Sequence, residues 1–163
     1  MATCQISWRE ENYASIEGDV GNNSNFDEIF TKVLPDIWVD LGGVSRMNSL
    51  GVHEWVKSVS KFGGAIHYVN VPMCVLEQFS VVREFSGKNA DVASFWAQYA
   101  CEHCRAEENV LLLVGKDIQP GLAEYEDGPL RKCPSCGHDM FFGHDPDTAL
   151  AWLTKMPMPL EYK

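Results

Sequence analysis

The stretch PDIWVDLGGVSRMNSLGVHEW, residues 35–55, contains two hydrophobic periods that meet at a polar turn. Apolar side chains at alternate positions of residues 37–41 predict a strand with one face more buried than the other. Over residues 52–59 the apolar side chains recur at intervals of three and four, which predicts an amphipathic helix. Asn48 and Ser49 lie where the period changes, and either side chain can cap the first helical turn. We therefore take this strand–turn–helix joint as the first candidate for a functional surface.

The flanking sequence predicts further strands and helices in alternation. The expected strands are 4–9, 13–20, 37–41 and 65–71, and the expected helices are 26–33, 48–59 and 72–82. The first two strands are close enough in sequence to form an antiparallel hairpin. Strands that alternate with helices favour parallel pairing, because the crossover helix returns the chain to the same end of the sheet. The first 85 residues thus predict an α/β fold of order ββαβαβα, with a mixed β-sheet covered by helices.

This element order and the turn sequence Asn48-Ser49-Leu50-Gly51 resemble a STAS domain, the domain of anti-sigma-factor antagonists and related bacterial regulators. Ser49 matches the serine that is phosphorylated in members of the family and Gly51 matches the family glycine, whereas Asn48 replaces the family aspartate. The resemblance covers about residues 3–85. It implies a protein partner such as an anti-sigma factor or a serine kinase. The surface that it implies consists of Asn48, Ser49, Leu50, Gly51, His53 and Trp55.

Ordinary structural roles also account for these residues without a partner. Asn48 and Ser49 are residue types that commonly do no more than cap a helix. Trp38 and Trp55 are either exposed at a partner-binding face or packed in the interior, and packing is the more common state of such large side chains. His67 falls inside an expected strand, which favours a structural role.

The six cysteines indicate a metal site in the second half of the chain. Cys101/Cys104 and Cys133/Cys136 form two Cys-x-x-Cys pairs separated by a strand-bearing insert, which is the pattern of a zinc ribbon. A segment this small has little hydrophobic core of its own, so a structural Zn²⁺ is the expected cofactor.

Other uses of the same residues remain open at this point. His103 and His138 lie close enough to the pairs to replace a cysteine as a ligand. Four thiolates also suit rubredoxin-like iron, although zinc is favoured. The alternative function is therefore a redox- or metal-sensing protein that acts through the cysteine cluster.

Composition excludes some classes of partner and supports others. The formal net charge of −10 disfavours binding to nucleic acid or to anionic membranes, which requires a basic surface. We find no apolar run of about 20 residues and no secretory signal, and we expect a cytoplasmic protein. Phosphate-binding loops, dinucleotide fingerprints and nucleophile elbows are likewise missing from the sequence, so we expect a non-enzymatic regulator.

The predicted organisation has four parts: a STAS-like domain over 1–86, a connecting helix or linker over 87–99, a zinc ribbon with a terminal helix over 100–155, and a tail over 156–163. The connecting helix rests on Val92, Phe95, Trp96 and Tyr99, which recur at helical spacing.

Overall fold

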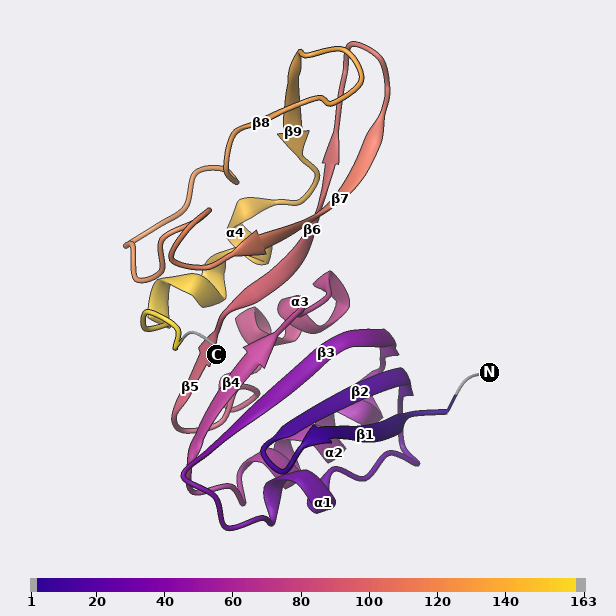
Figure 1. Ribbon diagram of the computed structural model, residues 1–163, viewed down its shortest axis with the longest axis vertical. Coiled ribbons are helices and arrows are strands. Elements are labelled where there is room, and N and C mark those ends of the chain that lie inside the picture. Colours follow the sequence, from indigo (N-terminus) through magenta and orange to yellow (C-terminus); the bar gives the residue numbers. More distant parts are fainter. Residues whose placement is uncertain (1–2, 161–163) are drawn as a thin grey trace.

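The computed structural model describes residues 3–160, which form two β-sheets and a set of short helices (Figure 1). In chain order the elements are β1 (Gln5–Glu10), β2 (Tyr13–Val20), α1 (Asp27–Phe30), β3 (Asp36–Met47), α2 (Ser49–Val59), β4 (Ala65–Val69), α3 (Met73–Val81), β5 (Ala90–Val92), β6 (Ser94–Ala100), β7 (Glu107–Leu113), β8 (Arg131–Lys132), β9 (Asp139–Phe142), α4 (Pro146–Ala149) and the 3₁₀ helix η1 (Ala151–Lys155). The order ββαβαβα expected from the sequence is confirmed, and so is the mixed α/β class.

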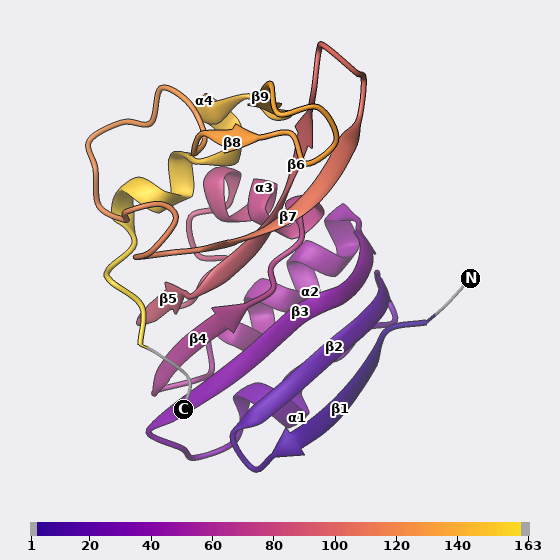
Figure 2. The same cartoon turned by 45° about the horizontal axis from the view of Figure 1, so that its top comes forward.

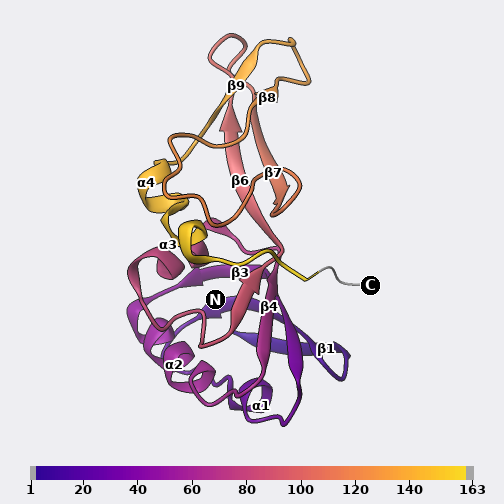
Figure 3. The same cartoon turned by 90° about the vertical axis from the view of Figure 1, so that its left-hand side faces the viewer.

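The first sheet has the strand order β1-β2-β3-β4-β5. Strand β1 pairs antiparallel with β2, and β2 through β5 run parallel to one another, as Figure 2 shows. Helices α1, α2 and α3 cover one face of this sheet (Figure 3). The sequence explains this cover, because Ile37, Val39 and Leu41 occupy alternate positions along β3, share one face of the sheet and are fully buried under the helices.

Strand β3 is longer than the sequence predicted. Residues 42–47, expected as a turn, continue the strand to Met47. Gly42 and Gly43 permit this extension, because β2 and β3 approach closely here. A Cβ on Gly43 would lie 2.5 Å from the Cβ of Glu17 on β2. Bulges in the β2–β3 pairing accompany the close approach. The polar turn therefore starts at Asn48.

For residues 87–99, expected as a connecting helix or linker, the helix is wrong, because this segment contains β5 and most of β6. Phe95 and Tyr99 are four residues apart, and an interval of four fits one face of a helix and one face of a strand equally well. The burial pattern resolves the ambiguity: Phe95, Ala97 and Tyr99 point inward while Trp96 and Gln98 are more exposed. Residue 93 alone separates the two strands, so the chain passes directly from the first sheet into the second.

The second sheet is antiparallel and has the order β7-β6-β9-β8. One continuous hydrophobic core joins it to the first sheet. Trp152 of η1 packs edge-on against Phe95 at 5.3 Å between ring centroids, and its backbone N–H donates to Ser80 Oγ of α3. The C-terminal helix predicted after Asp145 is confirmed: the Asp145 side chain accepts from the Asp147 N–H and caps α4.

The segment 156–163 was expected to be a loose tail. Residues 156–160 contain no helix or strand, but the Leu160 N–H donates to Asp91 Oδ2 on β5, so this part is attached to the first sheet. Residues 161–163 lie outside the described part of the chain. Within residues 3–160, no helix is both long and apolar enough to cross a membrane.

Candidate metal centre and helix-start surface

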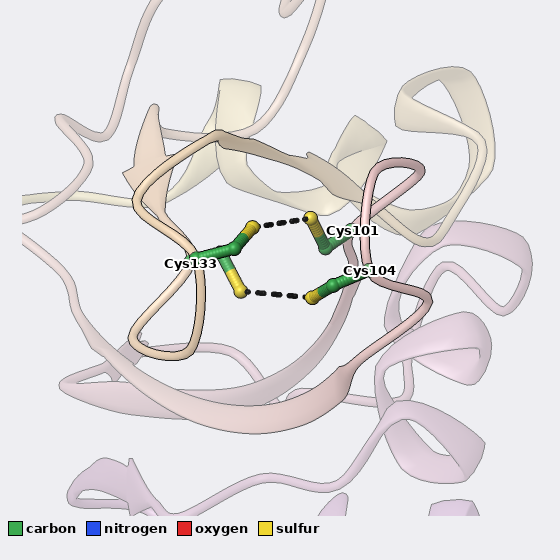
Figure 4. Close-up of side chains that lie close together, drawn as sticks. Cys101, Cys104 and Cys133 are labelled. Atoms are coloured by element: carbon green, nitrogen blue, oxygen red, sulfur yellow. Dashed lines mark hydrogen bonds between the residues drawn. The ribbon is translucent and has the colours of Figure 1, made fainter.

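The four paired cysteines lie in two hairpin loops that face each other. Cys101 and Cys104 occupy the loop between β6 and β7, and Cys133 and Cys136 occupy the loop between β8 and β9. The Sγ atoms of Cys101 and Cys136 are 3.6 Å apart, and those of Cys104 and Cys133 are 3.5 Å apart (Figure 4). All four Sγ atoms lie within 4.8 Å of one another. The predicted metal-ligating residues are therefore brought together.

The two loops share one backbone design. In each, the N–H of the residue after the second cysteine donates to the carbonyl of the first cysteine: Arg105 to Cys101 at 2.8 Å, and Gly137 to Cys133 at 2.9 Å. Both donors have positive φ, 61° for Arg105 and 78° for Gly137. Glycine adopts this conformation freely, whereas arginine adopts it at a cost. The glycine missing from the first Cys-x-x-Cys pair is thus replaced by an arginine held in the same backbone conformation.

The sulfur spacing fits a tetrahedral ion better than it fits disulfides. A Zn²⁺ ion with Zn–S bonds of about 2.3 Å separates its sulfurs by about 3.8 Å, whereas a disulfide requires about 2.05 Å. All four cysteines are free thiols. The cluster therefore has the donor set and the spacing of a metal site.

Hydrogen bonds from backbone amides act to lower the pKa values of Cys133 and Cys136. Burial raises the pKa of Cys133, but N–H donation from Cys136 and Ser135 outweighs burial and holds this pKa at about 6. The His138 N–H lowers the pKa of Cys136, yet burial and the neighbouring sulfurs prevail and raise it to about 12. Cys133 is thus the first of the two to supply a thiolate, the form that binds a metal.

His103 and His138 flank the cluster as stacked, exposed rings, with centroids 3.7 Å apart and an interplanar angle of 11°. Their ligand atoms and that of Cys136 also lie within 4.8 Å of one another. His103 and His138 therefore lie close enough to Cys136 to form an alternative ligand group. The four cysteines nevertheless form the larger donor set, in which Cys101 and Cys133 are buried.

The helix-start surface is divided between exposed and buried residues. Asn48 Oδ1 accepts from the Gly51 N–H at 2.9 Å, so the predicted cap is present. Asn48, Ser49, Leu50 and His53 are exposed, and Leu50 keeps 55% of its surface.

Trp55 and Gly51 do not belong to this surface. Trp55 is fully buried, stacks on Phe85 and donates from Nε1 to the Phe85 carbonyl at 2.8 Å. Gly51 is buried against β2, where a Cβ would lie 2.3 Å from the Val20 carbonyl oxygen. Their assignment to a partner-contacting face was therefore wrong: helical periodicity places residues 51 and 55 on the inward side. Trp38 is also packed, 4% exposed on the other face of the sheet.

A cavity of about 600 Å³ opens beside the helix start. Arg46, Asn48 and Ser24 line it together with the two unpaired cysteines, Cys4 and Cys74. Burial raises the pKa of both thiols. Nothing in the spacing of these cysteines in the sequence shows that Cys4, just before β1, and Cys74, in α3, meet at one cavity.

Comparisons with protein-family models, with curated proteins and with solved structures found no match at the significance required.

Proposed function

We propose that this chain is a non-enzymatic regulatory protein that binds a partner protein through the start of α2. The supporting observation is the exposed group Asn48, Ser49, Leu50 and His53 on the first turns of a well-capped helix. Leu50 offers a partner an apolar contact at this turn, and Asn48 lines the adjoining cavity. The resemblance to STAS domains points to the same turn, and an anti-sigma factor or a serine kinase is the kind of partner it implies.

Phosphorylation of Ser49 is part of this proposal. Ser49 is the first residue of α2 and is exposed, so a kinase can reach its hydroxyl. A phosphate would bring about −1.5 to −2 charges to a helix N-terminus, where the helix dipole favours negative charge. The domain would stay folded while the surface offered to the partner changed. Asn48, where the family has aspartate, avoids placing a second negative charge beside the phosphate.

For the cysteine cluster we propose a structural Zn²⁺ held by Cys101, Cys104, Cys133 and Cys136. Four protein ligands complete a tetrahedral site and leave no open position for a substrate. The strands that the cluster joins are short, since β8 has two residues and β9 has four. A metal that links both hairpin loops would supply the stability that such strands lack.

The partner-binding proposal is tested by photo-crosslinking in the cell of origin, with a photoreactive residue at position 50. A matched control carries it at Val33, which is 99% exposed but lies away from the helix start. We expect a defined crosslinked partner at position 50 that is lost with Ser49→Asp and kept with Ser49→Ala. Equal crosslinking at positions 50 and 33 would contradict the proposed surface.

A second candidate function is a redox or metal sensor that acts through the same cysteines. The observation in its favour is that Cys104 is exposed, so an oxidant can reach one ligand of the cluster. Elemental analysis combined with mild peroxide treatment separates the two functions. One zinc per chain that is retained under mild oxidation supports a structural role, whereas bound iron or rapid metal release supports sensing.

A further inference from the structure

A row of side chains crosses the face of the first sheet opposite the helices. Tyr13, Trp38, His67 and Asp91 occupy neighbouring positions in register on β2, β3, β4 and β5. His67 is 5% exposed, and its ring lies against the Trp38 indole with centroids 4.6 Å apart. A histidine in so buried a place must satisfy both ring nitrogens or lose free energy.

Both ring nitrogens of His67 face carboxylates. Nδ1 is 2.9 Å from Asp91 Oδ2, and Nε2 is 3.5 Å from Asp36 Oδ2. Nε2 is buried without a hydrogen-bond partner in the described residues. A neutral imidazole carries one N–H, whereas the protonated ring carries two. The protonated ring can direct one N–H to each carboxylate, so this arrangement suits the imidazolium form.

The pKa of His67 shifts in the direction that this geometry favours. Burial alone lowers the pKa of His67, but the hydrogen bond and charge of Asp91, with the charge of Asp36, outweigh burial and raise the pKa above its ordinary value of 6.5. Within residues 3–160, these two carboxylates are the charged groups that act on the ring, one from β3 and one from β5.

The ion pair lies at an edge of the first sheet. Strand β5 has three residues and, within residues 3–160, pairs with β4 alone (Figure 2). Asp91 sits at its centre and also accepts the Leu160 N–H of the C-terminal segment at 3.3 Å. After β5 the chain enters the metal-binding sheet within two residues. The Asp91 carboxylate therefore adds a side-chain contact, for the C-terminal segment and for β5, to backbone hydrogen bonds such as that from Ala93 to Tyr68 of β4.

We propose that His67 is a pH-operated clamp: as an imidazolium between Asp36 and Asp91 it fastens β5 and the C-terminal segment to the parallel sheet, and it releases them when it loses its proton. After that loss, Asp91 is a carboxylate whose side chain is 10% exposed, with no opposite charge on His67. A buried, uncompensated charge is strongly unfavourable. Asp91 regains water when β5 or the C-terminal segment that contacts it through Leu160 moves away.

The direction of the pH effect follows from linkage. A raised folded-state pKa means that the folded protein binds this proton more tightly than the unfolded chain. The extra stability is fully present below about 6.5, the unfolded value. It is lost as the pH rises through the folded-state pKa of His67. Each unit of elevation corresponds to about a tenfold change in the opening equilibrium.

The test combines NMR titration of the His67 ring with hydrogen exchange on the metal-loaded full chain. We expect a ring pKa above 6.5. We also expect the protection of the Ala93 amide, which donates to the Tyr68 carbonyl at 2.8 Å, to fall as the pH rises, after correction for intrinsic exchange. The Val52 amide of α2 serves as the internal reference and should not respond.

Two variants and a control sharpen this test. His67→Gln keeps a side-chain donor but cannot titrate, so the pH dependence at Ala93 should disappear. Asp36→Asn keeps the Asp91 contact and should lower the ring pKa, which preserves the test if His67→Gln fails to fold. Asp27→Asn removes the same charge beside Lys61, away from the clamp, and should leave the ring pKa unchanged. A ring pKa at or below 6.5, or the same pH dependence in wild type and His67→Gln, would overturn the proposal.

Discussion

The two sheets of this protein solve the problem of stability in different ways. In the first sheet, parallel strands lie under three helices, and residues such as Ile37, Val39 and Trp55 are fully buried. In the second sheet, strands β8 and β9 are short, and the large side chains of Leu130 and Phe141 stay exposed. Hydrophobic burial therefore dominates in the first sheet. In the second, residues such as Phe95 and Tyr99 belong to the shared core, and four converging sulfur atoms join the two cysteine loops.

Because of this difference, we expect the two sheets to unfold separately and for different reasons. Removing buried apolar volume should weaken the first sheet, and removing a ligand should unfold the tip of the second. The two sheets share a core that includes Phe95 and Trp152, so loss of one sheet should still weaken the other to some extent.

The largest effect is expected from loss of the metal. Cys133→Ser, or a strong chelator, should abolish hydrogen-exchange protection across residues 101–142 while the amides of β3 and β4 stay protected. Structural zinc supplies about 10–16 kcal/mol of apparent binding energy in small zinc-binding peptides, which is more than short strands can replace. Acid should have the same effect, because protons compete with the metal for the thiolates. Metal content and exchange are measured on the same samples.

The matched control for this change is Cys74→Ser, a half-buried cysteine outside the cluster. It should keep the metal and the protection of residues 101–142. If Cys133→Ser left the second sheet intact, the proposed division of labour between metal and core would be incorrect.

The next largest effect tests the core of the first sheet. Trp55→Ala should lower the free energy of unfolding by about 3–5 kcal/mol, because it leaves a cavity among Phe26, Phe30 and Phe85. Urea denaturation measures the change, and metal content should stay at the wild-type level. Leu130→Ala, at a position 92% exposed, should change the stability by less than about 0.5 kcal/mol. Equal costs at the two positions would argue against the assigned core.

The smallest effect isolates backbone conformation in the second sheet. Gly137→Ala should cost about 1–2 kcal/mol, because alanine must adopt the left-handed conformation at φ 78°. A Cβ at Gly137 meets no atom within 4 Å, so steric contact does not contribute. Gly63→Ala has equally open space and an ordinary φ, and it should be neutral or slightly stabilising. Thermal unfolding of the metal-loaded proteins compares the two, and equal melting temperatures would contradict the strain argument.

Much of the first sheet could be predicted because its signals are local. Strand β2 was expected at the residues where it occurs, since alternation and the flanking turns coincide over 13–20. The cysteine cluster could be predicted for a similar reason, because two residues between cysteines allow one tight turn to present both sulfurs.

The predictions that failed concerned features that depend on contacts between residues far apart in the sequence. The spacing of Phe95 and Tyr99 fits helix and strand alike, and only pairing with β7 and β9 decides the outcome. The inward position of Trp55 follows from the same periodicity that predicted the helix, yet a resemblance to a family surface had placed it outside. The meeting of His67 with Asp36 and Asp91 requires the strand order and register, which a single sequence does not give.

The packing of Trp152 has a consequence for how the chain is made. Trp152 stands near the C-terminal end, yet it contacts Phe95 and lies near Phe79 of α3, with ring centroids 6.3 Å apart in the latter case. During synthesis the N-terminal strands and helices emerge first and can begin to fold. Until residue 152 leaves the ribosome, however, α3 lacks one of its aromatic neighbours and keeps an apolar side uncovered. Between the synthesis of α3 and the emergence of residue 152, the nascent chain therefore exposes an apolar surface, which Trp152 then covers.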